Sequence, residues 1–522
     1  MMLKEVMKSC DYAEGLSGIL PFLDKDIAGI AYDSRKVKEG YLFAAIKGEK
    51  YNGNDFIYDV MKKGAVAIVY EQGQPISETP GLGPDAAVCF LRVENSRRAL
   101  ACIANNFYQR PSENLALVGI TGTNGKTTTS YILKSILEAN GKNSGLIGTI
   151  QYIINNKIFP ALHTTPESPE FQGLLQDMFI SGCDVVVSEV SSHALAQHRV
   201  DYAVFRTAVF TNLTRDHLDY HKTMEQYFRA KERLFTELLN GDGAAVINID
   251  DPYGRRLNLL LKGRSSCSIT YSLDAKTGAD VIASDITHTF EGLRFRLSFE
   301  GRRYSISSPL LGTPNVYNIL SAAGAAVSMG VPWEAILDGI SNAKNIPGRF
   351  EKITAGQEFL CIIDYAHTED ALARLINTAR EMISTPAAEE GSRDIPDEKH
   401  PRVITVFGCG GDRDRGKRPG MGEIASRLSD YVIITSDNPR SEGPLDIIKD
   451  IAEGVVGDNY LIEPDRREAI RKALEMAVSG DIVLVAGKGH ESYQEIGGIR
   501  HEFSDRDVLK EIIRSGLTGR ST

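Results

Sequence analysis

The sequence predicts an α/β protein with three domains. A chain of 522 residues exceeds what one hydrophobic core organises, so about two to four domains are expected. Apolar segments typical of strands alternate with amphipathic segments typical of helices, which indicates parallel sheets. In the last third of the chain, each strand runs into a polar or glycine-rich loop, as in a doubly wound Rossmann-like sheet. We place the domains at residues 1–110, 111–346 and 347–522.

The first block predicts a small α/β domain. Apolar runs at 40–46 (GYLFAAI) and 64–70 (GAVAIVY) are typical of strands. The segment 95–112 has a helical pattern and is stopped by Pro111. Between them, Gly and Pro crowd residues 73–85 (GQPISETPGLGPD), which predicts a surface loop.

The second block predicts a P-loop-type parallel sheet. It opens with a strand, a glycine-rich turn and a helix over residues 114–141, and strand patterns then alternate with helical ones. From 266 to 310 the period becomes two, which predicts an antiparallel extension. The sequences of the strands and helices that follow the turn are DVVVSEV, TAVFTNL, EQYFRAKERLFTELL, GAAVINID and NVYNILSAAGAAVSMG.

The third block predicts the doubly wound sheet. Its four strands lead into the loops of FLCIIDYAH, RVITVFGCGG, YVIITSDNPR and DIVLVAGKGHE. The carboxyl ends of parallel strands meet at one edge, so these loops should gather there. Residues 384–402 are predicted to form an exposed loop without an assigned role.

Bulk properties exclude several classes. The net charge of −10 argues against a nucleic-acid binder. No apolar stretch is long enough to span a bilayer, and the first residues lack the core of a signal peptide, so we expect a cytoplasmic protein without membrane insertion. The seven cysteines are scattered and form no CxxC pair. We therefore expect neither a zinc site nor a disulfide framework.

The strongest single motif is GITGTNGKTT, residues 119–128. Small residues there let backbone N–H groups face a triphosphate at a helix N-terminus. Lys126 can reach the β- and γ-phosphates, and the Thr127 hydroxyl can bind Mg²⁺. The match to a P-loop is imperfect, because Ile120 stands where the first glycine is usual. A plain glycine-rich turn is the alternative, but the order strand, loop, helix favours ATP or GTP binding. The predicted nucleotide-binding residues are Gly122, Thr123, Asn124, Gly125, Lys126, Thr127 and Thr128.

Two later strands of this block end in possible metal ligands. Glu189 follows one strand, and it suits Mg²⁺. The stretch TNLTRDHLDYH places Asp216, His217, Asp219 and His221 after another. Both ends should lie at the same sheet edge as the phosphate loop. For His217, helix capping or packing remains the alternative.

Lys231 occupies an unexpected position. Tyr227, Phe228, Leu234 and Phe235 lie three or four residues from it, so it is on the apolar face of its helix. A lysine there usually packs its stem and extends its ammonium to water. Full burial would instead favour the neutral amine, which can react with CO₂ to give a carbamate able to bind Mg²⁺.

Motifs along almost the whole chain together resemble the Mur ligases. They run in the family's order from YDSR near residue 33 to GKGHE at 491, and include GTNGKTTT, HTTPES, EVSSHALAQHRV, TNLTRDHLDYH, YFRAKERLF, PGRFE, DYAHTEDAL, GCGGDRDRGKRP and DNPRSE. The resemblance implies three domains, one each for the UDP end of the substrate, for ATP and for an incoming amino acid. It also implies an ADP-forming amide ligase that acts on the peptidoglycan precursor UDP-N-acetylmuramoyl-L-Ala-D-Glu through an acyl phosphate.

The resemblance also implies roles for individual residues. Glu189, His217 and carbamylated Lys231 would hold Mg²⁺ together with Thr127. The family's contacts to the muramoyl peptide fall on Thr164, Thr165, Ser191, Gln197 and Arg199, and those to uridine on Tyr32 and Ser34. Contacts to ATP fall on Asn318, Arg349, Asp364 and His367. The resemblance implies a cytoplasmic enzyme, and we expect it to be monomeric.

The stretch DNPRSE, residues 437–442, indicates which amino acid is added. An Asx-Pro pair alone favours a turn. At the shared sheet edge, however, Arg413 and Arg440 could bind a carboxylate and Glu491 an ammonium. meso-Diaminopimelate carries both groups at its far end, whereas lysine lacks the carboxylate. We therefore predict meso-diaminopimelate, with discrimination over L-lysine that reaches on the order of a thousandfold or more. The predicted contacts are Arg413, Asp437, Asn438, Pro439, Arg440, Gly487 and Glu491.

Three alternatives remain at this point. Within the class these are a lysine-adding relative and a folylpolyglutamate synthetase. Outside it, a P-loop switch protein would bind nucleotide and signal through a partner, but it would not need the charged loops of the third block.

Overall fold

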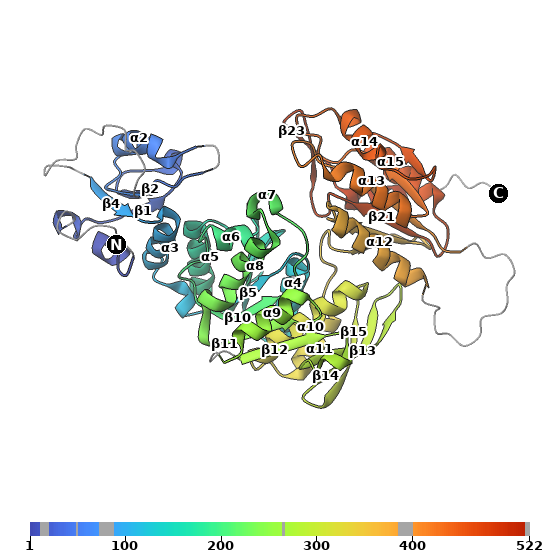
Figure 1. Cartoon of the computed structure of the whole chain (residues 1–522), viewed down its shortest axis with the longest axis horizontal. Coiled ribbons are helices and arrows are strands. Elements are labelled where there is room, and N and C mark those ends of the chain that lie inside the picture. Colours follow the sequence, from blue (N-terminus) through green and yellow to red (C-terminus); the bar gives the residue numbers. More distant parts are fainter. Residues whose placement is uncertain (11–19, 49–50, 72–87, 264–266, 385–399, 517–522) are drawn as a thin grey trace. The chain divides into compact units, whose positions relative to one another are not determined.

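The computed structural model confirms the predicted α/β class and contains three main sheets (Figure 1). It describes residues 1–10, 20–48, 51–71, 88–263, 267–384 and 400–516, so the loop predicted at 73–85 and most of the one at 384–402 lie outside the described residues. The chain divides into two compact units, Met1–Tyr271 with Ser321–Ile336 and Ser272–Leu320 with Leu337–Thr522. No helix in the described ranges is long and apolar enough to cross a membrane.

The first sheet of unit 1 has four parallel strands in the order β1-β2-β3-β4. Successive side chains of a strand point to opposite faces, so Leu42 and Phe43 enter two different cores. Helices α1 and α3 cover one face and α2 the other. The bounds are β1 Gly29–Ala31, β2 Tyr41–Ala44, β3 Ala67–Glu71, β4 Cys89–Val93, α1 Leu3–Val6, α2 Ile57–Lys62 and α3 Ser96–Phe107.

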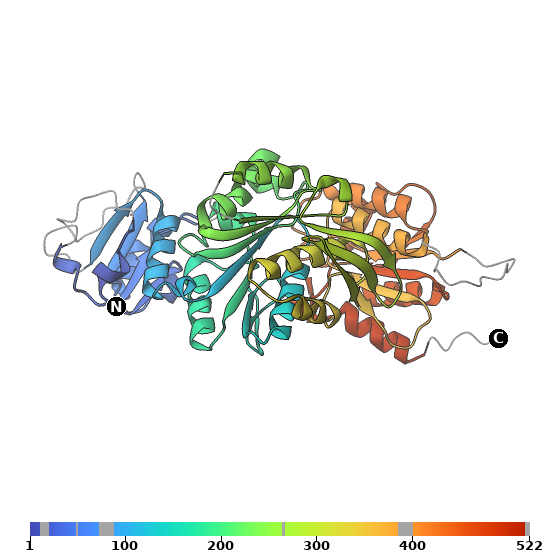
Figure 2. The same ribbon diagram turned by 90° about the horizontal axis from the view of Figure 1, so that it is seen from below.

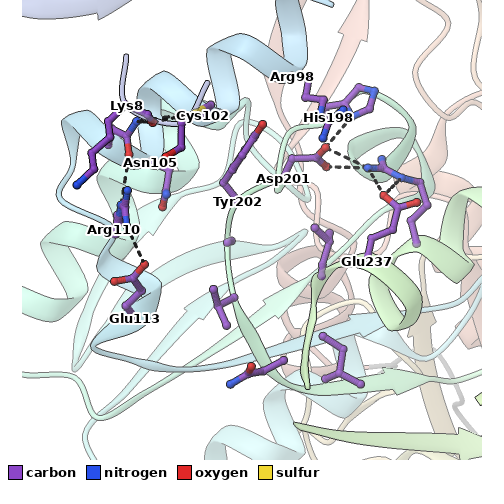
Figure 3. A pocket seen from close by; sticks show the side chains of 18 of the residues that line it. Lys8, Arg98, Cys102, Asn105, Arg110, Glu113, His198, Asp201, Tyr202 and Glu237 are labelled. Atoms are coloured by element: carbon purple, nitrogen blue, oxygen red, sulfur yellow. Dashed lines mark hydrogen bonds and ion pairs between the residues drawn. The ribbon is translucent and has the colours of Figure 1, made fainter. Parts of the chain in front are cut away.

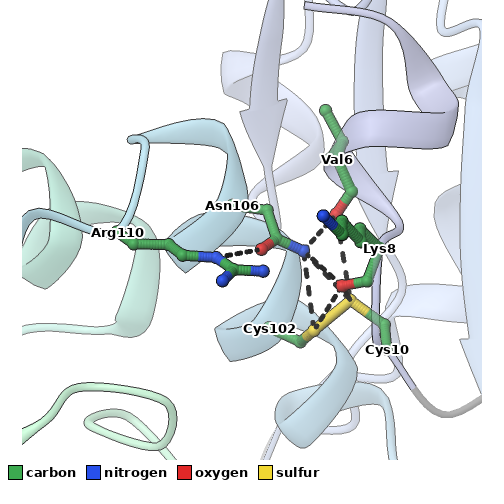
Figure 4. Close-up of a disulfide and its surroundings, with 6 residues drawn as sticks. All are labelled: Val6, Lys8, Cys10, Cys102, Asn106 and Arg110. Carbon is green, nitrogen blue, oxygen red and sulfur yellow. Dashed lines mark hydrogen bonds between the residues drawn. A yellow bond between two sulfur atoms is a disulfide. The ribbon is translucent and has the colours of Figure 1, made fainter. Parts of the chain in front are cut away.

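A disulfide joins the N-terminal segment to α3, contrary to the sequence prediction. Cys10 and Cys102 are bonded, with their Cα atoms 5.7 Å apart (Figure 4). The side-chain amide of Asn106 lies against both sulfurs and donates to the carbonyl oxygens of Val6 and Lys8 at 3.0 and 2.7 Å. The prediction failed because 92 residues separate the two cysteines, and only the folded sheet brings them together.

The second sheet follows the order β12-β11-β10-β5-β9-β6-β7-β8, and helices lie on both of its faces (Figure 2). Strands β5, β6, β9, β10, β11 and β12 are parallel, and β7 and β8 add an antiparallel edge. The strands are β5 Ala116–Thr121, β6 Ser144–Ile147, β7 Gln151–Ile154, β8 Lys157–Pro160, β9 Val185–Glu189, β10 Phe205–Phe210, β11 Leu239–Asn248 and β12 Cys267–Ser272. The helices are α4 Lys126–Ala139, α5 Ser168–Ile180, α6 Ser192–Ala196, α7 Leu218–His221, α8 Met224–Arg233, a π-helical turn Leu234–Leu238 and α9 Pro252–Leu261.

The antiparallel extension predicted from residue 266 begins later. Strand β12 pairs parallel with β11, because helix α9 returns the chain to the starting edge before β12 begins. The antiparallel part is the meander of β13 Val281–His288, β14 Leu293–Phe299 and β15 Arg302–Ser308 in unit 2. Period-two alternation alone did not distinguish the half-buried β12 from these strands.

The third sheet, in unit 2, has the order β16-β17-β21-β18-β19-β20. All its pairs are parallel except β16 with β17, and apolar clusters lie on both faces, as expected for a doubly wound sheet. The strands are β16 Glu351–Ile353, β17 Leu360–Asp364, β18 Val403–Phe407, β19 Tyr431–Ile434, β20 Tyr460–Ile462 and β21 Ile482–Ala486, with a hairpin β22 Tyr493–Ile496 and β23 Ile499–Glu502. The remaining helices are α10 Thr313–Ser328, α11 Trp333–Ser341, α12 Glu369–Ser384, α13 Lys417–Leu428, α14 Pro444–Ala452, α15 Arg466–Met476 and α16 Asp505–Arg514.

Candidate active site

The phosphate loop of unit 1 connects β5 to α4. Gly125 stands before the helix with φ +89°, a conformation that side chains disfavour. At Gly122 a Cβ would lie 1.8 Å from the Thr211 hydroxyl oxygen, so only glycine fits. The loop thus brings backbone N–H groups to the N-terminus of α4, where the helix dipole favours an anion.

Two lysines meet at this loop. The Nζ atoms of Lys126 and Lys231 donate to the same Gly122 carbonyl oxygen, at 2.9 and 2.8 Å. Lys231 is only 1% exposed, so its ammonium does not reach solvent. Burial, and then the charge of Lys126, hold the pKa of Lys231 well below its usual range. The structure therefore supports the buried, neutral amine over a lysine that extends to water.

The Glu189 carboxylate accepts hydrogen bonds from residues of two segments. Glu189 is fully buried at the end of β9, and its carboxylate accepts from the Thr127 hydroxyl at 2.9 Å. The Thr149 backbone N–H and hydroxyl also donate to it, both at 2.9 Å. Gly148 permits this approach, since a Cβ there would lie 2.5 Å from the carboxylate. Sequence reasoning missed Thr149, because its position next to a glycine carries no motif.

A histidine cluster lies beyond the phosphate loop. The ring of His193 lies edge-to-face against that of His217 and tilted against that of His221, at centroid distances of 4.7 and 5.5 Å. Burial is the main cause that lowers the pKa of His217 and of His221 to about 4. The His217 ring nitrogen is 3.4 Å from Asp216, and His221 bonds the Ser192 hydroxyl at 2.9 Å. These imidazoles are neutral at pH 7, the form that can bind a metal. His193 was not predicted, although it follows Glu189 closely in the sequence.

The residues predicted to hold Mg²⁺ fit a hard cation only in part. Glu189 and Thr127 present oxygen atoms side by side, as Mg²⁺ requires. Lys231 supplies an oxygen ligand only as its carbamate. In the described ranges, no three His, Cys, Asp or Glu side chains gather closely enough to form a metal site by themselves.

The predicted muramoyl-peptide contacts form a connected group. The Thr165 hydroxyl donates to the Glu189 backbone carbonyl at 2.8 Å and accepts from the Ser191 N–H at 3.1 Å. Arg199 donates to the Thr165 carbonyl at 3.0 Å and to the Gln197 amide oxygen at 2.7 Å. Thr164 joins the group through the Thr149 hydroxyl at 3.1 Å. All of them lie around the carboxyl end of β9.

The predicted uridine contacts lie on the first sheet. The Tyr32 hydroxyl donates to Glu170 at 3.0 Å. Tyr32 therefore contacts α5, a helix of the second sheet. The Ser34 carbonyl accepts from Lys63 at 2.7 Å. Neither residue contacts the phosphate loop through a hydrogen bond in the described structure.

In unit 2, three of the four predicted ATP contacts cluster at the carboxyl end of β17. The Arg349 guanidinium lies 5.0 Å from the Tyr365 ring, and Asp364 accepts from the Phe350 N–H at 2.7 Å. The His367 ring bonds the Tyr365 carbonyl at 2.8 Å. The fourth, Asn318, is buried in α10 and donates to Asn315 at 2.9 Å.

Tyr365 and His490 lie beside this cluster and were not predicted from the sequence. The Tyr365 ring lies 5.4 Å from that of His490, whose Nδ1 is buried without a partner among the described residues. Burial lowers the pKa of His490 to about 4. Gly348 packs so closely on the His490 backbone that a Cβ would lie 2.2 Å from its nitrogen.

The loops after β18, β19 and β21 meet at one edge, as predicted. The Asn438 amide nitrogen donates to Glu491 at 2.7 Å, and the Arg440 guanidinium to the Gly411 carbonyl at 2.6 Å. Gly487 has φ +111°, and a Cβ added to it would lie only 2.5 Å from an Asp437 carboxylate oxygen. Glycine at this position therefore leaves room for the Asp437 side chain. Arg413 is exposed on the neighbouring loop.

A turn is present too, but it begins at Pro439 rather than at Asp437. The Glu442 N–H donates to the Pro439 carbonyl at 3.0 Å, and Arg440 has φ +53°. Pro439 and Arg440 therefore belong both to this turn and to the loop cluster.

A separate cavity of about 770 Å³ lies at the other edge of the second sheet, where β10 and β11 begin. Asn105, Arg110 and Glu113 line one side of it, and Tyr202 lies between them and Asp201 (Figure 3). This cavity is thus distant from the phosphate loop, which follows the opposite end of β5.

Comparisons with known proteins cover nearly the whole chain. Three family models match: "Mur ligase family, catalytic domain" at residues 26–108, "Mur ligase middle domain" at 120–326 and "Mur ligase, glutamate ligase domain" at 348–489. The UDP-N-acetylmuramoyl-L-alanyl-D-glutamate–2,6-diaminopimelate ligase of Solibacter usitatus is 44% identical, with 98% of each chain covered.

Two solved structures of Mur ligases are also similar to the chain. A UDP-N-acetylmuramoyl-L-alanyl-D-glutamate–2,6-diaminopimelate ligase is 33% identical with a TM-score of 0.68 and 99% coverage of both chains. MurF from Thermotoga maritima, solved with ADP, shares the fold at 20% identity and a TM-score of 0.60, covering 95% of this chain and 99% of its own.

Proposed function

The chain belongs to the Mur ligase family, and we propose that it joins meso-2,6-diaminopimelate to UDP-N-acetylmuramoyl-L-alanyl-D-glutamate in an ATP-driven, ADP-forming reaction. The named diaminopimelate ligases at 40–44% identity over 94–98% of the chain support this activity. It is a step in the synthesis of the peptidoglycan precursor. We expect the enzyme to act as a monomer in the cytoplasm.

The reaction must first make a carboxylate electrophilic. The D-glutamyl carboxylate attacks the γ-phosphorus of ATP, ADP leaves, and an acyl phosphate forms. The amine of the incoming amino acid then attacks the acyl carbon, and the tetrahedral adduct expels phosphate to leave an amide. Charge builds on the phosphoryl oxygens in the first step, so cations and N–H donors must be in place.

The phosphate loop supplies these groups. The Gly122–Gly125 backbone and the N-terminus of α4 are suited to the β- and γ-phosphates, and Lys126 lies within reach of the loop. When Mg²⁺ is bound, it neutralises phosphate charge. Glu189, Thr127 and His217 would hold it, together with Lys231 as its carbamate. The buried neutral amine of Lys231 is the form that reacts with CO₂.

One observation supports diaminopimelate over lysine: the convergence of Arg440, Asn438 and Glu491 at one sheet edge. The guanidinium and the amide suit a carboxylate, and Glu491 suits an ammonium. A second amino-acid head group has both charges. Lysine would present only its amine and leave Arg440 without an anion.

Release of ADP tests the proposal. The purified protein is assayed with ATP, UDP-N-acetylmuramoyl-L-alanyl-D-glutamate and meso-diaminopimelate, and then with each one omitted. We expect ADP release to need all three, and the product mass to equal the sum of dipeptide and amino acid less one water. An equal rate of ADP release with and without the amino acid would indicate a nucleotide switch instead.

A further inference from the structure

Lys488 lies at the centre of the amino-acid loop cluster, between Gly487 and His490, and is fully buried. None of the contacts assigned above includes it. A buried lysine is rare unless its ammonium is paired. The groups around the Lys488 ammonium therefore indicate the role of its charge.

All three hydrogens of the Lys488 ammonium have acceptors. Nζ lies 3.1 Å from the Asn438 amide oxygen and 3.4 Å from a Glu491 carboxylate oxygen, and it donates to the Tyr493 carbonyl. These acceptors come from three segments: the loop after β19, the loop after β21 and the start of β22. Lys488 is thus the shared donor that connects them.

These contacts fix the orientation of the Asn438 side chain. Its amide oxygen accepts from Lys488 and also from the Glu495 N–H at 2.9 Å. Because two donors face that oxygen, the amide cannot turn over without placing NH₂ against both of them. The amide nitrogen must therefore point to Glu491, which it reaches at 2.7 Å. Asn438 is only 2% exposed, so no water can replace these partners.

The same ammonium balances the acidic groups of the cluster. Asp437, Glu491 and Asp505 are the carboxylates that act on Lys488, and Arg466 is the other cation, paired with Asp505 at 2.7 Å. Burial raises the pKa of Glu491, and the Lys488 charge opposes that rise. Without Lys488, Glu491 would take up a proton more readily and lose its ability to bind an ammonium.

We infer that Lys488 is a positioning residue for the amino-acid substrate: it orients the Asn438 amide and keeps Glu491 in place to receive the distal head group. This inference rests on the proposed function. Lys488 itself does not touch the substrate, since all its donors are engaged inside the protein. Its effect should therefore be confined to one of the three substrates.

The test compares Lys488→Met with the unmodified enzyme. Methionine fills a similar volume without the charge, so the fold should persist. We expect the KM for meso-diaminopimelate to rise by about 10- to 100-fold, from the loss of charged hydrogen bonds. The KM for ATP and for the UDP-linked dipeptide should change less than about threefold, because both bind other residues.

The pH profile separates positioning from a loss of stability. In Lys488→Met, the acidic limb of kcat/KM for the amino acid should move to higher pH, since Glu491 has lost the neighbouring cation. A lysine that only stabilises the fold would leave this limb in place. Lys472→Met is the matched control, because the half-buried Lys472 of α15 pairs with Glu463, and this ion pair includes no residue of the loop cluster. Lys472→Met should change neither the KM for meso-diaminopimelate nor the pH of the acidic limb.

Besides an acidic limb that stays in place, two outcomes would overturn the inference. The KM for the amino acid could stay within threefold of the control, or all three KM values could rise together. If Lys488→Met does not fold, Lys488→Gln, which keeps one donor but no charge, must show the selective change. Failure of the unmodified enzyme to use meso-diaminopimelate would contradict the proposed function instead, before any variant is made.

Discussion

Replacing Arg440 with alanine should remove most of the preference for meso-diaminopimelate over L-lysine. Arg440 lies in the turn after β19, and its guanidinium donates to the Gly411 carbonyl at 2.6 Å. Glu495 is 4.0 Å away, too far for a close ion pair. The guanidinium therefore keeps donors available for the distal carboxylate of the substrate.

The structure sets the size of this preference. Loss of one partner from a buried, hydrogen-bonded charge pair costs about 2–5 kcal/mol. The Arg440 side chain is 22% exposed, so water can solvate part of it when lysine binds. We therefore take the lower end, about 2–3 kcal/mol, which corresponds to a ratio of roughly 30–150 in kcat/KM. This is below the thousandfold expected from the sequence, which assumed full burial.

The assay measures kcat/KM for both amino acids in the unmodified enzyme and in Arg440→Ala. The ratio should fall from roughly 30–150 to below about 5, mainly through weaker use of meso-diaminopimelate. Arg427→Ala is the control, because Arg427 pairs with Glu423 on an exposed helix face. An unchanged ratio in Arg440→Ala would refute the assigned role of Arg440.

Three further predictions concern the phosphate loop, the buried lysine and the histidines. Lys126→Ala should lower kcat by about 10²–10³-fold or more without unfolding, as shown by thermal melting, and near-normal turnover would contradict the loop assignment. Lys231→Ala should lose activity and regain part of it with added short carboxylic acids, which can replace the carbamate as ligands; full activity of this variant without CO₂ would exclude the carbamate. His221 and His490 have pKa values of about 4, below the ordinary 6.5, so the unfolded chain binds more protons between these values. The urea midpoint should fall as the pH drops from about 6.5 to 4, and a flat profile would show that neither histidine is buried neutral.

The sequence predicted the sheets well because their signals are local. The loop from Gly122 to Thr127 follows a strand and opens a helix, and the structure has β5 and α4 there. The edge location of Asn438 and Glu491 also followed from sequence, because parallel strands place their carboxyl ends together.

What the sequence missed depends on tertiary packing. Thr149 donates twice to Glu189 from a segment that lies 40 residues before it, with no motif of its own. The burial of Lys231 was left open because helical periodicity gives a face but not what covers it. The Cys10–Cys102 bond depends on how the N-terminal segment packs on α3.

Lys488 shows a third limit. The stretch GKGHE drew attention to its glycine and glutamate, which suit a ligand, whereas the lysine was passed over. Only the hydrogen bonds to Asn438 and Tyr493 show that its charge is directed inward.

The most direct test of the account follows oxygen through the reaction. UDP-N-acetylmuramoyl-L-alanyl-D-glutamate with ¹⁸O at both oxygens of the reacting D-glutamyl carboxylate is incubated with ATP, meso-diaminopimelate and the enzyme, and the products are analysed by mass spectrometry. An acyl phosphate intermediate predicts one ¹⁸O in the inorganic phosphate for each ADP, and one retained in the new amide that links D-glutamate to diaminopimelate. Phosphate without ¹⁸O, or ADP formed without the tripeptide product, would contradict it.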